Sequence, residues 1–271
     1  MSIHEVTDED AEDILAEALE FLGGKPVIEN NFIRYGSLVL TLAPKEGKAN
    51  SLLADHLFSP ALFLAERIER GLLHDLSGKT VVELGAGTAL PSLLLSIQAN
   101  PPSLLVVTDY PDPAILGNVE ANVQRNAALV KPGCTVKCEG YEWGTDPLKL
   151  LEICKSDNGS KGGYDVMILS DLLHFFDSHD VLLSSISMLL ARTKEARVFI
   201  GAGSYTRAHV CENFLQKGEE MGLCLDEIID NDKWLGTLPV SDLDLEALSL
   251  RKNNCRYWVG RWSDVPQLTP S

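Results

Sequence analysis

The chain has 271 residues, of which 45% are hydrophobic and 23% are charged, proportions typical of a folded globular protein. This length suits one large α/β domain with a small appendage, and the apolar runs are too short to cross a bilayer. A formal net charge of −16 repels phosphate backbones, so we expect no nucleic-acid partner, and it favours a basic protein or a cationic small molecule.

The six cysteines include no Cys-x-x-Cys pair, and their closest spacing is Cys134-x3-Cys138. We therefore expect reduced thiols and no metal site. The acidic stretch 8–10 is unlike a signal or transit peptide, which favours a cytoplasmic protein. We expect no membrane association and a monomer.

Residues 1–50 are predicted to form an N-terminal extension made of a helix and a β-hairpin. Apolar residues recur at helical spacing after Thr7, which can cap the helix, and a pair of glycines ends it. The predicted elements are a helix over 7–22, strands Phe32–Tyr35 and Leu38–Leu42, and a loop over 43–50.

Residues 51–271 are predicted to form the main domain, in which strands and helices alternate from Lys79 onward. The expected strands are Thr80–Leu84, Leu104–Thr108, Val136–Glu139, Tyr164–Leu169, Arg197–Ile200, Leu223–Ile229 and Cys255–Arg261. The expected helices are Leu57–Arg70, Leu90–Ala99, Pro113–Asn126, Pro147–Cys154, Val181–Leu190, Ala208–Met221 and Asp242–Leu250, and Ser156–Gly163 is expected to be a loop. This pattern predicts an α/β fold with a Rossmann-like, seven-stranded, mostly parallel sheet, helices on both faces and an antiparallel C-terminal strand.

The segment Val81–Gly87 predicts a strand that runs into a glycine loop and then a helix. Glycines let the backbone approach a ligand closely, and the start of the helix supplies free N–H groups. A dinucleotide fingerprint needs a third glycine, but Leu90 stands there, and the Gly-Lys-Ser/Thr of a phosphate loop is absent. The loop therefore indicates a ligand that places no pyrophosphate against the loop backbone.

Two acids end the first two strands of the alternating region. Glu83 can accept a hydrogen bond from a ligand ammonium group, directly or through water. Asp109 can hold both hydroxyls of a ribose, as acids do in nucleotide-binding α/β folds. The alternative for Asp109 is an acid favoured by the helix dipole, which suits Asp112 better. The two acids and the loop together predict a nucleoside-binding site.

Four segments resemble the fungal branch of the seven-β-strand S-adenosylmethionine-dependent methyltransferases that is labelled nicotinamide N-methyltransferase-like. These segments are Val82–Leu93, Thr108–Pro113, Glu139–Gly144 and Ile168–Leu173. Characterised members of that branch methylate the N-terminal glycine and adjacent lysine of translation elongation factor 1-alpha. The resemblance therefore implies S-adenosylmethionine as the cofactor and a basic protein, such as that factor, as the substrate.

The resemblance also implies which residues contact the cofactor. They are Glu83, Gly85, Ala86 and Gly87 at the methionine part, Asp109 at the ribose, Tyr110 and Trp143 at the adenine, and Ser170 with Asp171 where the sulfonium meets the acceptor. An aromatic face such as that of Trp143 stacks well on a purine, although an indole that only packs in the core is the alternative.

The chain departs from the family before the glycine loop. There the family has a His-x-Leu-Trp motif and a second Leu-Trp, whereas this chain has Leu53 and Phe58 in place of the two tryptophans. Because that stretch packs over the cofactor in the family, we expect Phe58 to contact the cofactor. The replacements affect the expected acceptor more than the expected cofactor.

Methyl transfer from a sulfonium is an in-line displacement, so the protein mainly positions and desolvates the acceptor. Asp171 is predicted to orient an amine or attract its cation, and His174, where related lysine methyltransferases often have a tyrosine, to relay its proton. The alternatives are a turn-capping role for Asp171 and a packing role for His174. Tyr205 and Arg207 follow the fifth strand and are predicted to face the same cleft.

Three functions stay open on the sequence. The branch motifs and the acidic charge favour a protein N-methyltransferase. The lost tryptophans, with Phe58, Phe175 and Phe176, leave a small-molecule N-methyltransferase such as nicotinamide N-methyltransferase as the alternative. A cofactor-binding module without turnover is a third hypothesis, against which the complete set of predicted cofactor residues argues.

Overall fold

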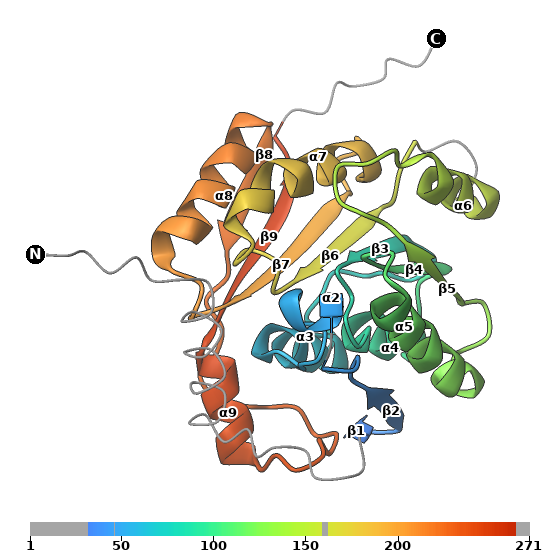
Figure 1. Ribbon diagram of the computed structural model, residues 1–271, viewed down its shortest axis with the longest axis vertical. Helices are drawn as coiled ribbons and strands as arrows, with labels where there is room; N and C mark the ends of the chain where they lie inside the picture. The colour runs from blue at the N-terminus through green and yellow to red at the C-terminus, as the bar shows by residue number, and fades with distance from the viewer. Residues whose placement is uncertain (1–31, 46, 159–161, 264–271) are drawn as a thin grey trace, which may run out of the picture.

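A computed structural model describes residues 32–45, 47–158 and 162–263, and the helix predicted over 7–22 lies outside them. Figure 1 shows one central sheet with helices on both faces. Its strands are β3 (Thr80–Leu84), β4 (Leu104–Asp109), β5 (Thr135–Gly140), β6 (Val166–Ser170), β7 (Arg197–Gly203), β8 (Leu223–Glu227) and β9 (Cys255–Trp262). Their order is β5-β4-β3-β6-β7-β9-β8.

The first five strands of that order pair in parallel, and β9 runs antiparallel to both of its neighbours, β7 and β8. Each parallel strand is followed by a helix that returns the chain to the end of the sheet where the strands begin, as parallel pairing requires. The predicted Rossmann-like sheet with an antiparallel C-terminal strand is therefore confirmed.

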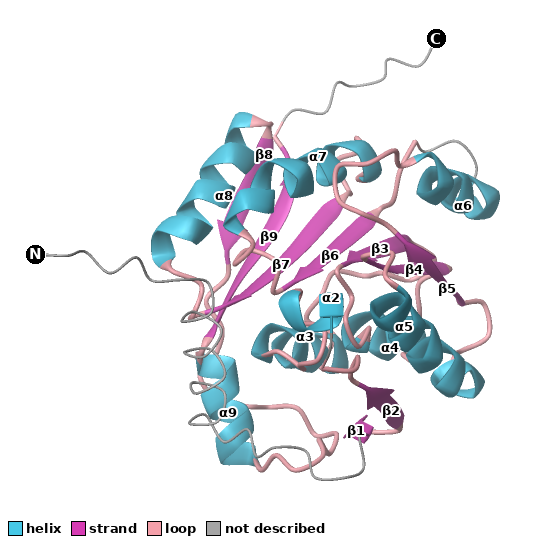
Figure 2. Ribbon diagram, in the orientation of Figure 1, coloured by secondary structure: helices cyan, strands magenta, loops and turns pink. Residues whose placement is uncertain are grey.

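Helices cover both faces because successive residues of the inner strands are apolar on both sides. In β3, Val81 packs into one hydrophobic cluster and Val82 into the other. The first cluster includes residues of α3 (Ser59–Glu69) and α4 (Leu90–Ser96), and α5 (Pro113–Asn126) packs on the same face. The second includes residues of α6 (Leu148–Asn158), α7 (His179–Leu189) and α8 (Ala208–Glu220). Figure 2 shows these two layers of helices beside the sheet.

A separate hairpin of β1 (Phe32–Tyr35) and β2 (Leu38–Thr41) lies against α5. The side-chain amide of Asn126 accepts from the N–H of Val39 at 2.9 Å and donates to its C=O at 2.8 Å, and Asn122 makes the matching pair with Thr41 at 2.8 Å each. These amides pair the outer backbone of β2, which would otherwise be an open edge. The predicted hairpin is thus confirmed and is anchored to the main sheet through α5.

Two predicted loops are partly helical. Residues 43–50 contain most of α2 (Gly47–Ser51), a five-residue helix that buries Ala49 near Ile115 of α5, and α6 extends to Asn158. A helix this short has no periodicity of its own, so only its tertiary contacts reveal it. The C-terminal helix, α9 (Leu245–Asn253), begins three residues later than predicted, because Asp244 caps it by accepting from the N–H of Ala247 at 2.8 Å.

Within the described residues no helix is both long and apolar enough to cross a membrane. No disulfide links any of the six cysteines, all of which lie in the described part of the chain. No group of three or more histidine, cysteine or acidic side chains in this part of the chain is arranged to hold a metal ion.

Candidate functional site

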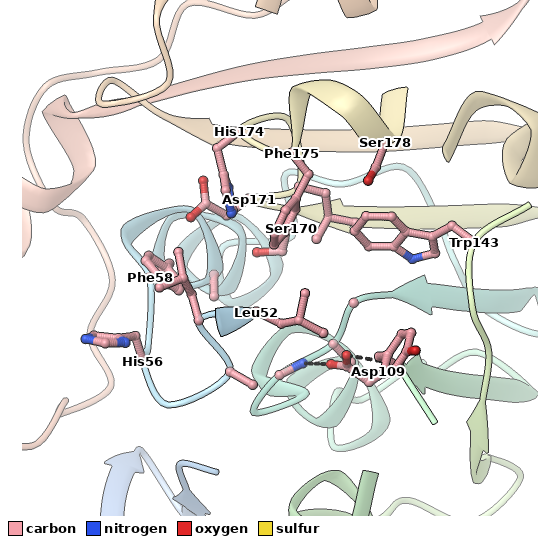
Figure 3. Close-up of a pocket in the computed structure, with 18 of the residues that line it drawn as sticks. Leu52, His56, Phe58, Asp109, Trp143, Ser170, Asp171, His174, Phe175 and Ser178 are labelled. Carbon is pink, nitrogen blue, oxygen red and sulfur yellow. Dashed lines mark hydrogen bonds between the residues drawn. The ribbon is translucent and has the colours of Figure 1, made fainter. Parts of the chain in front are cut away.

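A cavity of about 230 Å³ opens at the carboxyl ends of β3, β4 and β6, the edge where open parallel sheets bind ligands. Ten of the eleven residues predicted from the sequence line it: Phe58, Gly85, Ala86, Gly87, Asp109, Tyr110, Trp143, Ser170, Asp171 and His174. Figure 3 shows Ser170, Asp171, His174, Phe175 and Trp143 along one side of the cavity and Leu52 and Asp109 along the other. Residues far apart in the sequence therefore meet here.

The glycine loop forms the floor of the cavity. Gly85 and Gly87 have φ angles of +56° and +54°, a conformation that only glycine adopts without strain. A Cβ at Gly85 would lie 2.7 Å from Leu172 and 3.2 Å from Trp143, whereas a Cβ at Gly87 would meet nothing within 4 Å. Gly85 therefore makes room for its protein neighbours, and Gly87 leaves room in the cavity.

Asp109 joins the end of β4 to the glycine loop. Its Oδ2 accepts from the N–H of Gly87 and its Oδ1 from the N–H of Tyr110, both at 2.7 Å, and Figure 3 draws both bonds. Burial raises the pKa of Asp109, and the two N–H donors oppose that rise. The ring of Tyr110 lies beside it, with the ammonium of Lys48 4.6 Å from the ring centroid.

Glu83, unlike the other predicted cofactor residues, does not line the cavity. Its side chain is fully buried beneath the loop, where Oε2 accepts from the N–H of Ser92 at 3.2 Å and Oε1 has no partner. Burial raises its pKa to about 8. Because Ser92 lies in the first turn of α4, Glu83 satisfies one of the free N–H groups of that helix. Its predicted contact with a ligand ammonium stays a prediction.

Asp171 marks the other end of the cavity. It follows β6 with a left-handed φ of +65°, an uncommon conformation for a residue with a side chain. Its Oδ1 accepts from the N–H of Gly203 at 3.1 Å, and its Oδ2 accepts from the hydroxyl of Tyr205. Burial raises its pKa to about 6, and the hydroxyl of Tyr205 and the N–H of Gly203 oppose the rise.

Aromatic rings surround this end of the cavity. The ring of His174 lies 3.9 Å from that of Phe175 and 6.4 Å from that of Phe58, and Phe175 in turn meets Trp143 edge-on at 5.6 Å. Both ring nitrogens of His174 are buried without a partner, and burial lowers the pKa of His174 to about 4. His174 is therefore neutral at physiological pH, and Asp171 carries the charge at this end.

Several residues that the sequence did not single out also line the cavity. The turn after α2 contributes Leu52, Ala54 and His56, and Nδ1 of His56 lies 2.8 Å from the carboxylate of Asp55. The adjacent Asp-His pair was a signal, but neighbours in the sequence do not reveal which side of a turn they face. Tyr205 and Arg207, predicted to face the cleft, are not among the lining residues.

A family model described as lysine methyltransferase matches residues 41–220, more than half of the sequence. The chain belongs to the lysine methyltransferase family. It is accordingly an S-adenosylmethionine-dependent methyltransferase with the seven-stranded fold of that class.

Two fungal relatives of this lysine methyltransferase family member are named Protein N-terminal and lysine N-methyltransferase EFM7. The protein of Gibberella zeae is 32% identical over 202 residues, which is 71% of this chain and 75% of the relative. That of Schizosaccharomyces pombe is 28% identical over 190 residues, 68% of this chain and 70% of the relative. A methyltransferase from Pyrococcus furiosus shares the fold, with a TM-score of 0.50, 14% identity and coverage of 95% of this chain and 99% of that one.

The cavity of this lysine methyltransferase family member fits S-adenosylmethionine. Gly87 leaves open space at the loop, and Asp109 presents a carboxylate at the end of β4. The hydroxyl of Ser170 is buried without a partner, and the indole of Trp143 offers an aromatic face to the same cavity. A sulfonium nucleoside needs this combination of polar acceptors and a ring to stack on.

Proposed function

We propose that this protein methylates an amine of another protein, at its N-terminus or at a lysine, and that translation elongation factor 1-alpha is the substrate. The two relatives described above support the reaction type by their names. The observation that carries the proposal is the acceptor end of the cavity, where Asp171 is the buried acid among aromatic rings. A carboxylate in such surroundings attracts an ammonium group and orients it after deprotonation.

The cofactor roles predicted from the sequence are proposed with it. Asp109 holds the ribose hydroxyls, Tyr110 and Trp143 flank the adenine, and the backbone at Gly85–Gly87 contacts the methionine part. When bound, S-adenosylmethionine supplies an activated methyl group. Ser170 and Asp171 position the acceptor amine opposite it, and the surrounding rings exclude water, which strengthens the attraction between the carboxylate and the amine.

His174 is proposed as a packing residue that shapes the acceptor end, rather than as the proton relay that the sequence suggested. A neutral imidazole with a pKa of about 4 is a poor proton acceptor near pH 7. The amine proton therefore leaves toward Asp171 or toward solvent. This change follows from burial, which the sequence alone does not reveal.

The proposal is tested by methyl transfer into a cell lysate and then into purified elongation factor 1-alpha, with tritiated S-adenosylmethionine. The expected result is a labelled band that mass spectrometry assigns to the N-terminal residue or a lysine. Asp171→Asn should lower the rate at least tenfold, about 1.4 kcal/mol. Asp177→Asn is the matched control, because Asp177 is exposed on the same connection and does not line the cavity.

A small-molecule acceptor is the alternative, because Phe58 and Phe175 do line the cavity. If nicotinamide or another heteroaromatic amine is labelled and no protein band is, the substrate is a small molecule and the proposed substrate class is wrong. If calorimetry detects no binding of S-adenosylmethionine, the result would instead favour a protein that does not catalyse methyl transfer. A cytoplasmic location, a monomeric state and the absence of nucleic-acid or membrane partners stay predictions from the sequence.

A further inference from the structure

The side chain that holds Asp171 comes from outside the cavity. Tyr205 follows β7 and is not among the lining residues, yet its hydroxyl donates to Oδ2 of Asp171. The N–H of Gly203, the last residue of β7, donates to Oδ1 at 3.1 Å. Both carboxylate oxygens are therefore held by the end of β7 and the residues that follow it. Any influence of Tyr205 on the acceptor must pass through Asp171.

Gly203 is built to admit the ring of Tyr205. A Cβ at position 203 would lie 2.2 Å from Cε1 and 2.3 Å from Cζ of that ring, far closer than two carbon atoms can approach. Only glycine lets the ring fold back across the end of β7. Gly203 thus provides both an N–H for Asp171 and the space that brings the hydroxyl of Tyr205 to the same carboxylate.

Asp171 itself is held in an unusual conformation. Its φ of +65° is one that residues with side chains keep where the surrounding structure requires it, often at functional sites. Its N–H donates to the C=O of Gly201 at 2.8 Å, which fixes the backbone from β7 as well. Three hydrogen bonds, two with the end of β7 and one with Tyr205 just after it, therefore determine where this carboxylate sits in the cavity wall.

The other ionisable groups around this pair do not stabilise the negative charge of Asp171, so the ionisation of Asp171 depends on Tyr205. Burial raises the pKa values of the thiols of Cys211 on α8 and Cys255 on β9, and burial lowers that of His174, so all three are neutral near pH 7. Arg251 on α9 is the nearby cation, and its guanidinium donates to Ser59 at 3.1 Å and to the C=O of Leu57 instead of Asp171.

We propose that Tyr205 is a positioning residue for methyl transfer, whose hydroxyl, admitted by Gly203, holds the Asp171 carboxylate as an anion at the acceptor end of the cavity. This inference rests on the proposed function, because it assigns Tyr205 to the amine-binding step. A protonated Asp171 neither attracts an ammonium group nor accepts its proton. Removing the hydroxyl of Tyr205 should therefore weaken acceptor binding at pH values where the wild-type protein still works.

The direct test is a ¹³C NMR titration of the protein labelled at aspartate carboxyls, with the Asp171 signal assigned through Asp171→Asn. We expect a pKa of about 6 for Asp171 in the wild type. Tyr205→Phe keeps the ring and removes the hydroxyl, so the pKa should rise by about one pH unit, a tenfold change in proton affinity. Gly203→Ala should have the same effect by displacing the ring.

Tyr164→Phe is the matched control. Tyr164 is a fully buried tyrosine, and its hydroxyl donates to the C=O of Leu150 at 2.7 Å, away from the cavity. This variant should lose thermal stability as Tyr205→Phe does, but it should leave the titration of Asp171 unchanged. An unchanged pKa of Asp171 in folded Tyr205→Phe, or an equal rise in Tyr164→Phe, would overturn the proposal.

The activity readout uses a synthetic peptide that begins Gly-Lys. In Tyr205→Phe, the fall of kcat/KM at low pH should begin at higher pH and KM for the peptide should rise at least threefold, with the affinity for S-adenosylmethionine unchanged. Because the NMR titration needs no acceptor, it decides the role of Tyr205 even if this peptide is not methylated. A wild-type protein that labels no peptide or protein would reject the proposed function and not the Tyr205–Asp171 contact.

Discussion

The two glycines of the loop have the same backbone conformation but different surroundings, so alanine at each should have a different effect. Gly85→Ala places a methyl group 2.7 Å from Leu172 and 3.2 Å from Trp143. The left-handed conformation costs about 1–2 kcal/mol for a residue with a Cβ, and crowding at two side-chain ends adds about 1 kcal/mol. The expected loss is about 2–3 kcal/mol of unfolding free energy, roughly 4–12 °C in Tm.

Gly87→Ala has the same backbone penalty without the crowding, because nothing lies within 4 Å of the added methyl group. It should cost about 1–2 kcal/mol of stability, but its methyl group occupies space that the cofactor needs. We expect the affinity for S-adenosylmethionine to fall at least tenfold, about 1.4 kcal/mol.

The assays are differential scanning fluorimetry without ligand and isothermal titration calorimetry with S-adenosylmethionine. Gly85→Ala should show the larger loss of Tm. Gly87→Ala should show the larger loss of affinity for S-adenosylmethionine relative to its loss of Tm. Wild-type affinity in Gly87→Ala would refute the reasoning that this face of the loop contacts the cofactor. Equal losses of Tm would refute the contrast in packing.

Three further predictions concern other buried ionisable side chains. Asp109→Asn should weaken S-adenosylmethionine binding at least tenfold by calorimetry, about 1.4 kcal/mol, while Asp112→Asn, which caps α5 equally well, should leave binding within threefold. Glu83 has a pKa of about 8 when folded, above its value in the unfolded chain, so its contribution to stability is complete at low pH and is lost as pH rises toward 8. In urea unfolding, Glu83→Gln should therefore gain stability relative to the wild type as pH rises from about 5 to about 8, and a constant difference would contradict this. Lys252→Met should cost about 3 kcal/mol because it removes the 2.7 Å ion pair of the buried Glu66 and leaves only the longer ion pair with Arg70 at 3.4 Å, and adding Glu66→Leu should recover most of the lost Tm.

The fold was predictable because its signals are local and repeated. The strand Leu104–Asp109 begins with four successive apolar residues, and the helix that follows it has apolar residues at helical spacing. The short helix α2 was missed, because five residues hold too little periodicity to be recognised. Element ends shifted by a few residues where a cap such as Asp244 decided the boundary.

The cavity was predictable to the extent that its residues follow strand ends. Parallel strands bring their carboxyl ends to one edge, which predicted Asp109 at the site, whereas Asp171 was expected there from the family resemblance; both line the cavity. Glu83 also ends a strand, but its side chain points beneath the loop into full burial. Which way a side chain faces at a strand end depends on the packing of the next turn, which alternation along the strand does not settle.

The sequence by itself determined the class of fold, the glycine loop at residues 85–87 and the acids around it, because backbone conformation and the alternation of strands and helices follow from local residue types. Only the tertiary structure decided the chemical state of those groups. The neutral His174 and the pKa of Asp171 near 6 arise from burial, and the contact of Asp171 with Tyr205 joins residues 34 positions apart. Desolvation depends on every neighbour in space, and a linear sequence does not list those neighbours.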